Sequence, residues 1–216
     1  MVILPISKQL KKAIHKKIAL AQDILVIEVY NHFPKAVIHG GTAIWRCYGS
    51  NRFSEDIDFY LPKIARQDLE KFLNDLKNKG FKVKKFKVTE RAIFSKFLYI
   101  DVDVQLEAVF KTIKNFITKA FELSDGTSII VNTLRAENLI EEKVISYLQR
   151  RKIRDLYDIY FLLRFVEERN VVDNLLKKLM EKFKLPIDEN ELKALIVSGA
   201  VPSFENIVEE IKKWVK

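Results

Sequence analysis

Residues 36–61 most constrain the fold, because they combine an apolar strand, a double-glycine turn, a short helix and a second strand that carries two aspartates. The apolar run 36–38 is typical of a buried strand. Gly40 and Gly41 follow it, and glycine allows the backbone to turn and to be approached closely. Thr42 is placed to cap the next helix. A strand, a glycine turn and a helix N-terminus together direct backbone N–H groups toward an anion, usually a phosphate.

Asp56 and Asp58 lie two residues apart at the start of the second strand, so their side chains share one face of it. Two neighbouring carboxylates repel each other, and a bound cation relieves that repulsion. Ligands that are all oxygens suit Mg²⁺ or Mn²⁺. Asp-x-Asp alone is common, and an exposed acidic strand end that binds nothing is the alternative. The glycine turn upstream, with Arg52 and Ser54 just before the aspartates, favours the metal site.

A second Asp-x-Asp, formed by Asp101 and Asp103, lies in the stretch from Arg91 to Val104. Apolar and polar residues alternate toward the end of this stretch, which predicts a strand with one face in the core. Both aspartates then face a wetter surface. The alternative is that they are ordinary solvent-facing strand residues.

The pattern becomes helical from residue 134 onward, so we predict two domains, 1–132 and 133–216. Lys143 lies beside the apolar stripe of a helix predicted over residues 138–150. Asp155 and Asp158 stand three residues apart and are therefore neighbours on one helical face. The alternative is a helix surface of internal ion pairs, each worth about 0.3–0.5 kcal/mol.

Four other segments have clear patterns. Residues 5–30 show helical spacing for one or two helices, and a helix over 66–79 should end at Gly80. Asp125-Gly126 predicts a hairpin within residues 120–133. Residues 81–88 alternate apolar residues with lysines, which indicates a half-exposed strand with a register shift or bulge. Its lysines either defend a sheet edge or form a track for nucleic acid.

The chain has 38 Lys and Arg against 29 Asp and Glu, a net charge of +9. This balance favours polyanionic partners, RNA or DNA first, although a charge-rich surface of the thermophilic type explains it equally well. The single cysteine, Cys47, excludes an intramolecular disulfide and a Cys-x-x-Cys zinc site. The sequence shows no signal peptide and no apolar run that could span a bilayer, so we expect a cytoplasmic protein without membrane partners.

Three motifs resemble those of a known family. Residues 40–43 (Gly-Gly-Thr-Ala) and 52–59 (Arg-Phe-Ser-Glu-Asp-Ile-Asp-Phe) resemble the first motif of the AbiEii/AbiGii-type nucleotidyltransferases, in the DNA polymerase β-like superfamily. Glu142-Lys143 and Arg154-Asp155-x-x-Asp158 resemble the second and third motifs. The resemblance implies an α+β nucleotidyltransferase fold, in which a mixed β-sheet is flanked by helices and followed by an α-helical C-terminal region.

The same resemblance implies the roles of the site residues. Two Mg²⁺ ions, or Mn²⁺, would be held by Asp56, Asp58 and a third carboxylate from a neighbouring strand, with Asp101 the first choice and Asp103 the second. Lys143 would contact the triphosphate, and Asp155 or Asp158 would assist the site or orient Lys143. The remaining phosphate-binding residues would be Gly40, Gly41, Thr42, Arg52 and Ser54.

The implied activity is transfer of a nucleotide from a nucleoside triphosphate to an RNA hydroxyl, a tRNA 3′ end first, or to a protein hydroxyl. Family members include toxins of toxin–antitoxin and phage-defence pairs, so a cognate antitoxin is the expected protein partner. Two alternatives remain open from the residues alone. One is a metal-dependent nuclease, which also uses clustered carboxylates, and the other is a noncatalytic RNA- or protein-binding module on the same fold.

Overall fold

The computed structural model describes residues 5–215 and divides into two compact units. The first, which we call the sheet unit, contains the chain up to Cys47 together with Ser54–Thr133. The second, the helical unit, contains Tyr48–Phe53 and the chain from Leu134 onward. The grouping of Tyr48–Phe53 with the helical unit was not indicated by the sequence. The two predicted domains stay a prediction, and their outermost residues, 1–4 and 216, lie outside the described residues.

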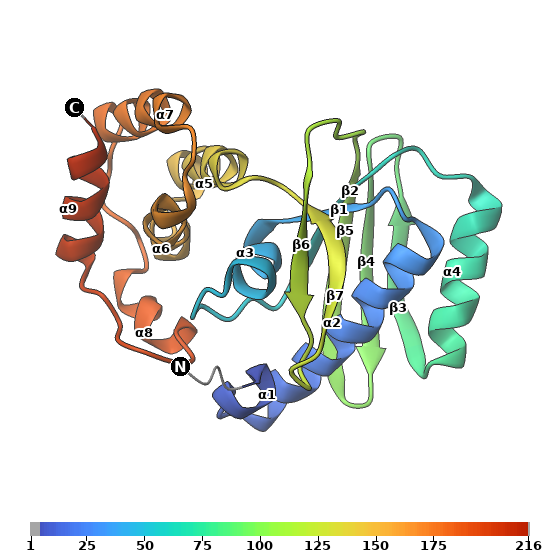
Figure 1. Ribbon diagram of the computed structural model, residues 1–216. Coiled ribbons are helices and arrows are strands. Elements are labelled where there is room, and N and C mark those ends of the chain that lie inside the picture. The colour runs from blue at the N-terminus through green and yellow to red at the C-terminus, as the bar shows by residue number, and fades with distance from the viewer. Residues whose placement is uncertain (1–4, 216) are drawn as a thin grey trace. The chain divides into compact units, whose positions relative to one another are not determined.

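The sheet unit is built on a seven-stranded sheet with the strand order β3-β4-β5-β2-β1-β7-β6 (Figure 1). Its strands are β1 (Val37–His39), β2 (Ile57–Leu61), β3 (Phe81–Val88), β4 (Ala92–Tyr99), β5 (Val102–Phe110), β6 (Ile117–Glu122) and β7 (Ser128–Thr133). β2 pairs antiparallel with β1 and parallel with β5, while β1 pairs parallel with β7. This mixed sheet with flanking helices confirms the expected α+β fold.

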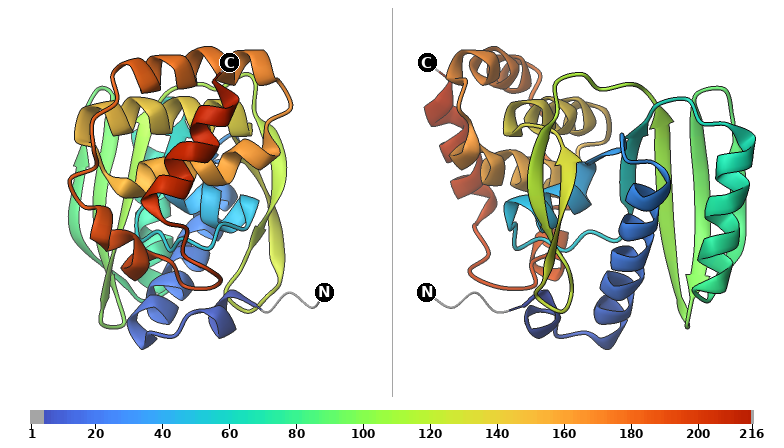
Figure 2. Two further views of the ribbon diagram at one scale, coloured as in Figure 1. Left: turned by 90° about the vertical axis from the view of Figure 1, so that its left-hand side faces the viewer. Right: turned by 45° about the vertical axis from the view of Figure 1, so that its right-hand side comes forward.

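Two long helices of this unit cover one face of the β3–β5 part of the sheet. The helices of the unit are α1 (Ile6–Gln9), α2 (Ala13–His32), α3 (Gly40–Tyr48, whose last residue groups with the helical unit) and α4 (Arg66–Asn78). α2 packs against α4 and β5, and α4 packs against β3, as Figures 1 and 2 show. In β5, Val104, Leu106 and Ala108 are buried, whereas the alternate residues, including Glu107, are exposed. The face of β5 that points away from the helices is therefore polar and open.

The prediction of one strand over residues 91–104 is wrong. This segment folds back on itself as a hairpin, in which β4 pairs antiparallel with β5 from Ala92↔Val109 to Tyr99↔Val102. Ile100 and Asp101 form the two-residue turn, and Ile100 has a left-handed φ of 56°. Such turns normally place glycine or asparagine there, because a β-branched side chain is strained at positive φ. The sequence lacks that signal, so it hides the turn.

Other local predictions are confirmed. β6 and β7 form the expected hairpin, and Gly126 takes a φ of 93° in its turn. α4 ends just before Gly80, which has a φ of 91°. The register of β3 against β4 shifts between Val83 and Lys85, as the lysine-rich strand was expected to do.

The helical unit contains α5 (Ala136–Arg150), α6 (Ile153–Leu162), α7 (Arg169–Glu181), α8 (Leu192–Leu195), α9 (Phe204–Trp214) and the short 3-10 helices η1 (Leu163–Phe165) and η2 (Glu189–Glu191). α5 packs on α6 and α7, and α9 packs on α6 and α7. Backbone hydrogen bonds also fix Tyr48–Phe53 in this unit: Phe53 N–H donates to the Leu195 carbonyl at 3.0 Å, and Val197 N–H donates to the Asn51 carbonyl at 2.9 Å. Among the described residues, no helix has both the length and the apolar character needed to cross a bilayer.

The strained turn gives a stability prediction. Ile100→Gly should raise the free energy of unfolding by about 0.5–1 kcal/mol, because relief of the left-handed strain exceeds the entropy cost of glycine. Ile130, a 70% exposed isoleucine in β7, is the matched control. Ile130→Gly should lower the same quantity by about 0.5–1 kcal/mol. Urea unfolding followed by circular dichroism measures both. A loss of stability in Ile100→Gly equal to that in the control would contradict the strain.

Candidate active site

The parallel pairing of β2 with β5 brings two carboxylates side by side. Asp58 and Glu107 are register partners, so their side chains leave the sheet on the same face. Asp58 is half-buried and Glu107 is exposed, on the face opposite the buried residues that flank each of them. His39 of β1 pairs with Asp58 on its other side. A row of His39, Asp58 and Glu107 therefore crosses three adjacent strands.

Gly40 gives the Asp58 carboxylate its room. A Cβ atom on Gly40 would collide with Asp58 Oδ2, and the φ of Gly40, 70°, is one that favours glycine. The expected proximity of Asp58 to the glycine turn is thus found. α3 begins at Gly40 itself. Thr42 therefore lies within the first helical turn, and its predicted role as the N-cap is wrong.

Buried hydrogen bonds hold the segment that leads into β2. The Thr42 hydroxyl donates to the Asp56 carbonyl at 2.5 Å, which ties α3 to the start of the strand. Gln22 of α2 donates its side-chain N–H groups to the carbonyls of Ser54 and Glu55, both at 2.9 Å. Gln22 and Thr42 are fully buried. Gln22 is a positioning residue that the sequence did not reveal, because its partners are more than 30 residues away in the chain.

The pKa of Glu107 reflects the charges of its neighbours. Partial burial, followed by the charges of Asp58 and Asp56, raises the pKa of Glu107 above its ordinary value, while Lys85 opposes the shift. Both aspartates therefore lie close enough to repel the Glu107 carboxylate. A cation placed among these three groups would relieve that repulsion.

The structure does not bring Asp101 or Asp103 to Asp58. Asp101 lies in the β4–β5 turn and forms an ion pair with Lys17 at 2.6 Å. Asp103 is on the open face, but it binds Lys84 at 2.8 Å and Lys96 at 3.0 Å. It precedes Glu107 by four residues, or about 13 Å along the strand.

Glu107, which none of the sequence motifs includes, occupies the position across from Asp58. The signal for it was present, because the apolar alternation continues through Leu106 and Ala108 and places Glu107 on the polar face.

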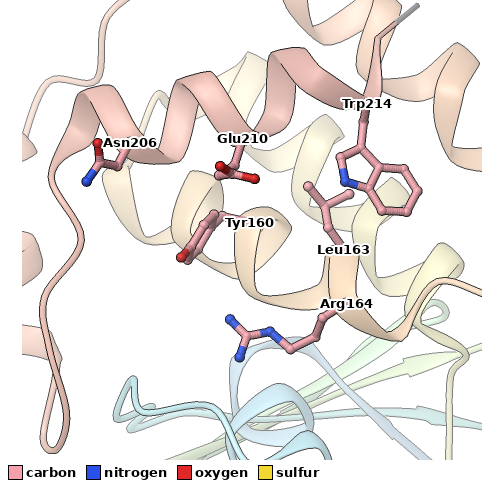
Figure 3. Close-up of a pocket in the computed structure, with 6 residues that line it drawn as sticks. All are labelled: Tyr160, Leu163, Arg164, Asn206, Glu210 and Trp214. Atoms are coloured by element: carbon pink, nitrogen blue, oxygen red, sulfur yellow. The ribbon is translucent and has the colours of Figure 1, made fainter.

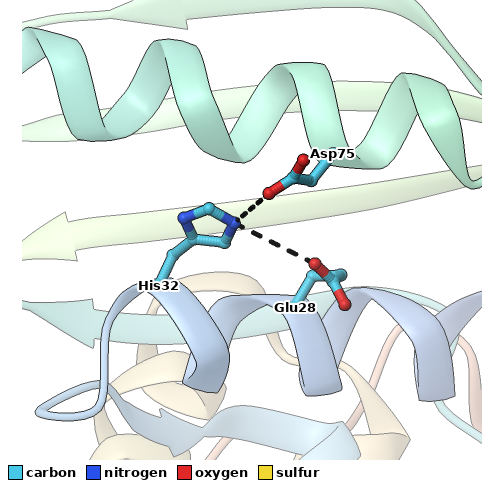
Figure 4. A group of neighbouring side chains, drawn as sticks. All are labelled: Glu28, His32 and Asp75. Atoms are coloured by element: carbon cyan, nitrogen blue, oxygen red, sulfur yellow. Dashed lines mark hydrogen bonds and ion pairs between the residues drawn. The ribbon is translucent and has the colours of Figure 1, made fainter.

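A different group of metal-ligating types lies in the helix layer. Glu28 and His32 of α2 and Asp75 of α4 have ligand atoms within 4.8 Å of one another (Figure 4). His32 Nε2 lies 2.9 Å from Asp75 Oδ2, and Lys79 Nζ lies 3.3 Å from Glu28 Oε1. These contacts engage both carboxylates and join α2 to α4. The helices cover the opposite face of the sheet from Glu107, so this group is separate from the Asp58–Glu107 pair.

The helical unit contains a second charged cluster, centred on Asp158 at the core of α6. Asp158 accepts two hydrogen bonds from Arg52, from Nε at 2.7 Å and from Nη2 at 2.8 Å. Lys143 Nζ lies 2.7 Å from Asp158 and 3.7 Å from Asp155. Arg150 donates to both oxygens of Asp155, at 2.8 and 2.7 Å. Both aspartates are 0% exposed, so this cluster is a buried ion network and not the surface helix of the alternative view.

This network changes the expected role of Arg52. Arg52 is 3% exposed, and its guanidinium also donates to the Phe53 carbonyl at 3.1 Å, so its hydrogen bonds serve the helical unit. Burial alone raises the pKa of Asp158, but Arg52 and Lys143 outweigh it, and the pKa lies below its ordinary value. The structure thus makes Arg52 an anchor for Tyr48–Phe53. Contact of Arg52 with phosphate stays a prediction, as does that of Lys143.

The helical unit also has a cavity of about 600 Å³ between α6, η1 and α9 (Figure 3). Tyr160, Arg164 and Trp214 lie along it, together with Leu163, Asn206 and Glu210. None of the residues predicted for the active site lines this cavity.

The buried network gives a prediction for Asp158. Asp158→Asn should lower the free energy of unfolding by about 3–5 kcal/mol, because it leaves buried cations without their counter-charge. The double variant Arg52→Met/Asp158→Leu should lose less free energy of unfolding than the sum of the losses in its two single variants, because it removes both partners of the ion pair. Urea unfolding of the four proteins measures the coupling. Additive losses would contradict a direct Arg52–Asp158 interaction.

The same pair sets the direction of a pH effect. The pKa of Asp158 in the folded protein lies below its ordinary value of 3.8. The ionised carboxylate therefore stabilises the fold fully at pH values above 3.8, and this stabilisation is lost as the pH falls through the folded pKa. The stability difference between the natural protein and Asp158→Asn should therefore be largest near neutral pH and should shrink below about pH 4. A difference that grows on acidification would contradict this assignment.

Comparisons with known proteins agree with this fold. JHP933 from Helicobacter pylori superposes with a TM-score of 0.61 over 91% of this chain and 89% of that chain, at 21% identity. MenT4, a nucleotidyltransferase toxin from Mycobacterium tuberculosis, superposes with a TM-score of 0.63 over 91% of this chain and 81% of that chain, at 17% identity. The antibiotic-resistance factor ANT(2″)-Ia superposes with a TM-score of 0.50 over 75% of this chain and 92% of that chain, at 16% identity. At these identities the likeness establishes the fold alone.

A search of curated protein sequences gave no match. The family model described as nucleotidyl transferase AbiEii toxin, type IV toxin–antitoxin system, matches residues 24–202. This match includes the Asp58–Glu107 pair of the sheet unit and the Asp158 network of the helical unit. The chain therefore belongs to the AbiEii family of toxins, and its enzyme class is nucleotidyltransferase.

Proposed function

We propose that this nucleotidyltransferase transfers a nucleotide from a nucleoside triphosphate to a hydroxyl of RNA, with a tRNA 3′ end as the first candidate. Asp58 and Glu107, with Asp56 beside them, would form its divalent-cation site. The observation that carries the proposal is the register pairing of Asp58 with Glu107 next to the glycine that begins α3. We thus assign the third carboxylate to Glu107, in place of Asp101 or Asp103.

The N-terminus of α3 supports the phosphate half of the proposal. Gly40 and Gly41, the first two residues of this nine-residue helix, add no side chains of their own to its first turn. N–H groups at a helix N-terminus bind phosphate oxygens, and the helix dipole favours the negative charge. The carboxylates and a triphosphate are all negative, so they share a site only when a cation lies among them.

The residues of the sheet unit fit such a cation. Asp56, Asp58 and Glu107 offer only oxygen donors, the type that Mg²⁺ and Mn²⁺ prefer. The raised pKa of Glu107 agrees with mutual repulsion among these carboxylates. A bound divalent ion supplies charge neutralisation at the attacked phosphate and at the departing pyrophosphate.

The proposed reaction is an in-line displacement. The acceptor oxygen forms a bond to the α-phosphorus as the bond from that phosphorus to the β-phosphate oxygen breaks. The hydroxyl proton passes to solvent, and pyrophosphate leaves. The chain's part is positional: Thr42 and Gln22 fix the strand entry, and the β2–β5 register fixes the two carboxylates.

By the family resemblance, Lys143 would contact the triphosphate. Its 2.7 Å ion pair with Asp158 fits the idea that Asp158 orients it. Asp155 is held by Arg150 and would act on Lys143 more weakly, at 3.7 Å. The type IV toxin–antitoxin description of the family supports an antitoxin as protein partner.

The first test is incubation of the full chain with each α-³²P-labelled nucleoside triphosphate, total RNA and Mg²⁺. We expect label in RNA and none after chelation with EDTA. Asp58→Asn and Glu107→Gln should each reduce the incorporation by about 100-fold or more, an amount typical of lost transition-state charge stabilisation. Shortened RNA without label would favour a nuclease, and the absence of any labelled product would favour a noncatalytic module.

The matched control for the carboxylate assignment is Asp101→Asn. It removes the same charge from the β4–β5 turn, where Asp101 is paired with Lys17. We expect less than a threefold change in incorporation, because at six residues from Glu107 it lies about 20 Å along the strand from the proposed site. A loss in Asp101→Asn as large as that in Glu107→Gln would contradict the assignment of the third carboxylate.

A further inference from the structure

The bulge in β3 gathers the lysines of that strand on one face. Lys82 pairs with Leu98, Lys85 with Lys96 and Lys87 with Phe94, and the register shifts by one residue in between. Without that shift, residues 82 and 85 would point to opposite faces, because side chains alternate along a strand. With it, both point to the same face of the sheet. Lys84, at the bulge, reaches Asp103 on that face at 2.8 Å.

This is also the face of the carboxylates. Phe94 of β4 pairs with Lys87 on one side and with Glu107 on the other, and Glu107 pairs with Asp58. One row of side chains thus runs across four strands in the order Lys87, Phe94, Glu107, Asp58. Neighbouring strands lie about 4.8 Å apart, so Phe94 is one strand from Glu107 and Lys87 is two strands from it.

Phe94 is unusual for its place in the sheet. It lies on β4, an interior strand, yet the residue is 39% exposed. Its chain neighbours Ile93 and Ser95 point to the helix-covered face and are buried. Lysines that only defended the β3 edge would not require an exposed ring on the next strand beside the carboxylates. We call Phe94 together with Lys82, Lys85 and Lys87 the lysine–phenylalanine track.

The charges of the track are available to a partner. Lys84 and Lys96 are both paired with Asp103. Among the residues that the structure describes, Lys82, Lys85 and Lys87 are exposed and have no ion pair within 4.0 Å. Lysines that follow a strand, with an aromatic ring among them, match the repeating phosphates and flat bases of a single-stranded nucleic acid.

We propose that the acceptor is single-stranded RNA and that it lies along the lysine–phenylalanine track. A base would stack on Phe94, backbone phosphates would contact Lys85 and Lys87, and the terminal hydroxyl would reach Glu107 and Asp58. This inference rests on the proposed nucleotidyl transfer, and it adds the surface that selects the acceptor. The triphosphate would then bind at the Asp58 end of the row, next to Gly40, and the RNA would bind at the β3 end.

The test measures binding of a fluorescein-labelled 12-nucleotide single-stranded RNA to the full chain by anisotropy, with EDTA and without nucleotide. Lys85→Gln/Lys87→Gln should weaken binding at least tenfold. The slope of log K against log salt should also become shallower by about 1.4, because about 0.7 counterions are released per phosphate contact. The matched control is Lys71→Gln/Lys77→Gln, which removes the same charge from α4 on the helix-covered face. It should change binding less than threefold.

Phe94 is tested separately, because stacking does not depend on salt. Phe94→Ala should weaken binding about tenfold with an unchanged salt slope, as expected for loss of one stacked base. Phe94→Tyr keeps an aromatic ring and should stay within threefold of the natural protein. Equal losses of RNA affinity in Phe94→Ala and Phe94→Tyr would overturn the proposal that RNA binds along the track. So would a loss of affinity in Lys71→Gln/Lys77→Gln as large as that in Lys85→Gln/Lys87→Gln.

Label transfer separates this inference from the function on which it rests. If the natural protein labels RNA and the track variants keep its KM for RNA, the track is overturned and the nucleotidyl transfer stands. If RNA binding responds as expected but no nucleotide is transferred, the proposed function fails while the track stands. If the label goes to protein and RNA does not bind, the RNA acceptor and the track are both overturned.

Discussion

The parallel pairing of β2 with β5 is the constraint on which the site depends. It places Asp58 and Glu107 in register on one face of the sheet, and Gly40 leaves space for the Asp58 carboxylate. Two like charges at this spacing oppose folding unless water or a cation screens them. The arrangement persists because the surrounding strands and helices are fixed by other interactions. Buried apolar residues on the opposite face of both strands provide most of that fixation.

Three buried polar residues then fix the ends of the segments that approach the site. Thr42 and Gln22 hold the backbone just before β2 within the sheet unit. Arg52, two residues before Ser54, is instead held by Asp158 in the helical unit. The residues of the motif 52–59 thus have two different structural roles. Its aspartates belong to the sheet unit, while its arginine holds the preceding loop through a buried ion pair.

The sequence predicted what depends on neighbours in the chain. The Asp125-Gly126 hairpin, the helix that ends at Gly80 and the closeness of Asp58 to the glycine turn all follow from local patterns, and the structure contains each of them. Glu107 was missed because the turn before it is made by Ile100 and Asp101, without glycine or asparagine. Treating two strands as one placed the third carboxylate at Asp101.

Contacts distant in sequence were beyond such reasoning. Arg52 and Asp158 are 106 residues apart, and nothing in either motif indicates that they meet. The spacing of Asp155 and Asp158 predicts a shared helical face but not its complete burial. The bulge in β3 was expected from its pattern, yet its effect on which face the lysines occupy required the register of the whole sheet. Local rules find turns and periods, whereas long-range pairing decides which faces meet.

The most direct test of the central claim is anomalous diffraction from crystals of the full chain grown with Mn²⁺ and a non-hydrolysable nucleoside triphosphate. We expect a manganese peak coordinated by carboxylate oxygens of both Asp58 and Glu107, with the triphosphate at the start of α3. A manganese peak only at Glu28, His32 and Asp75, or one that Glu107 does not contact, would contradict it.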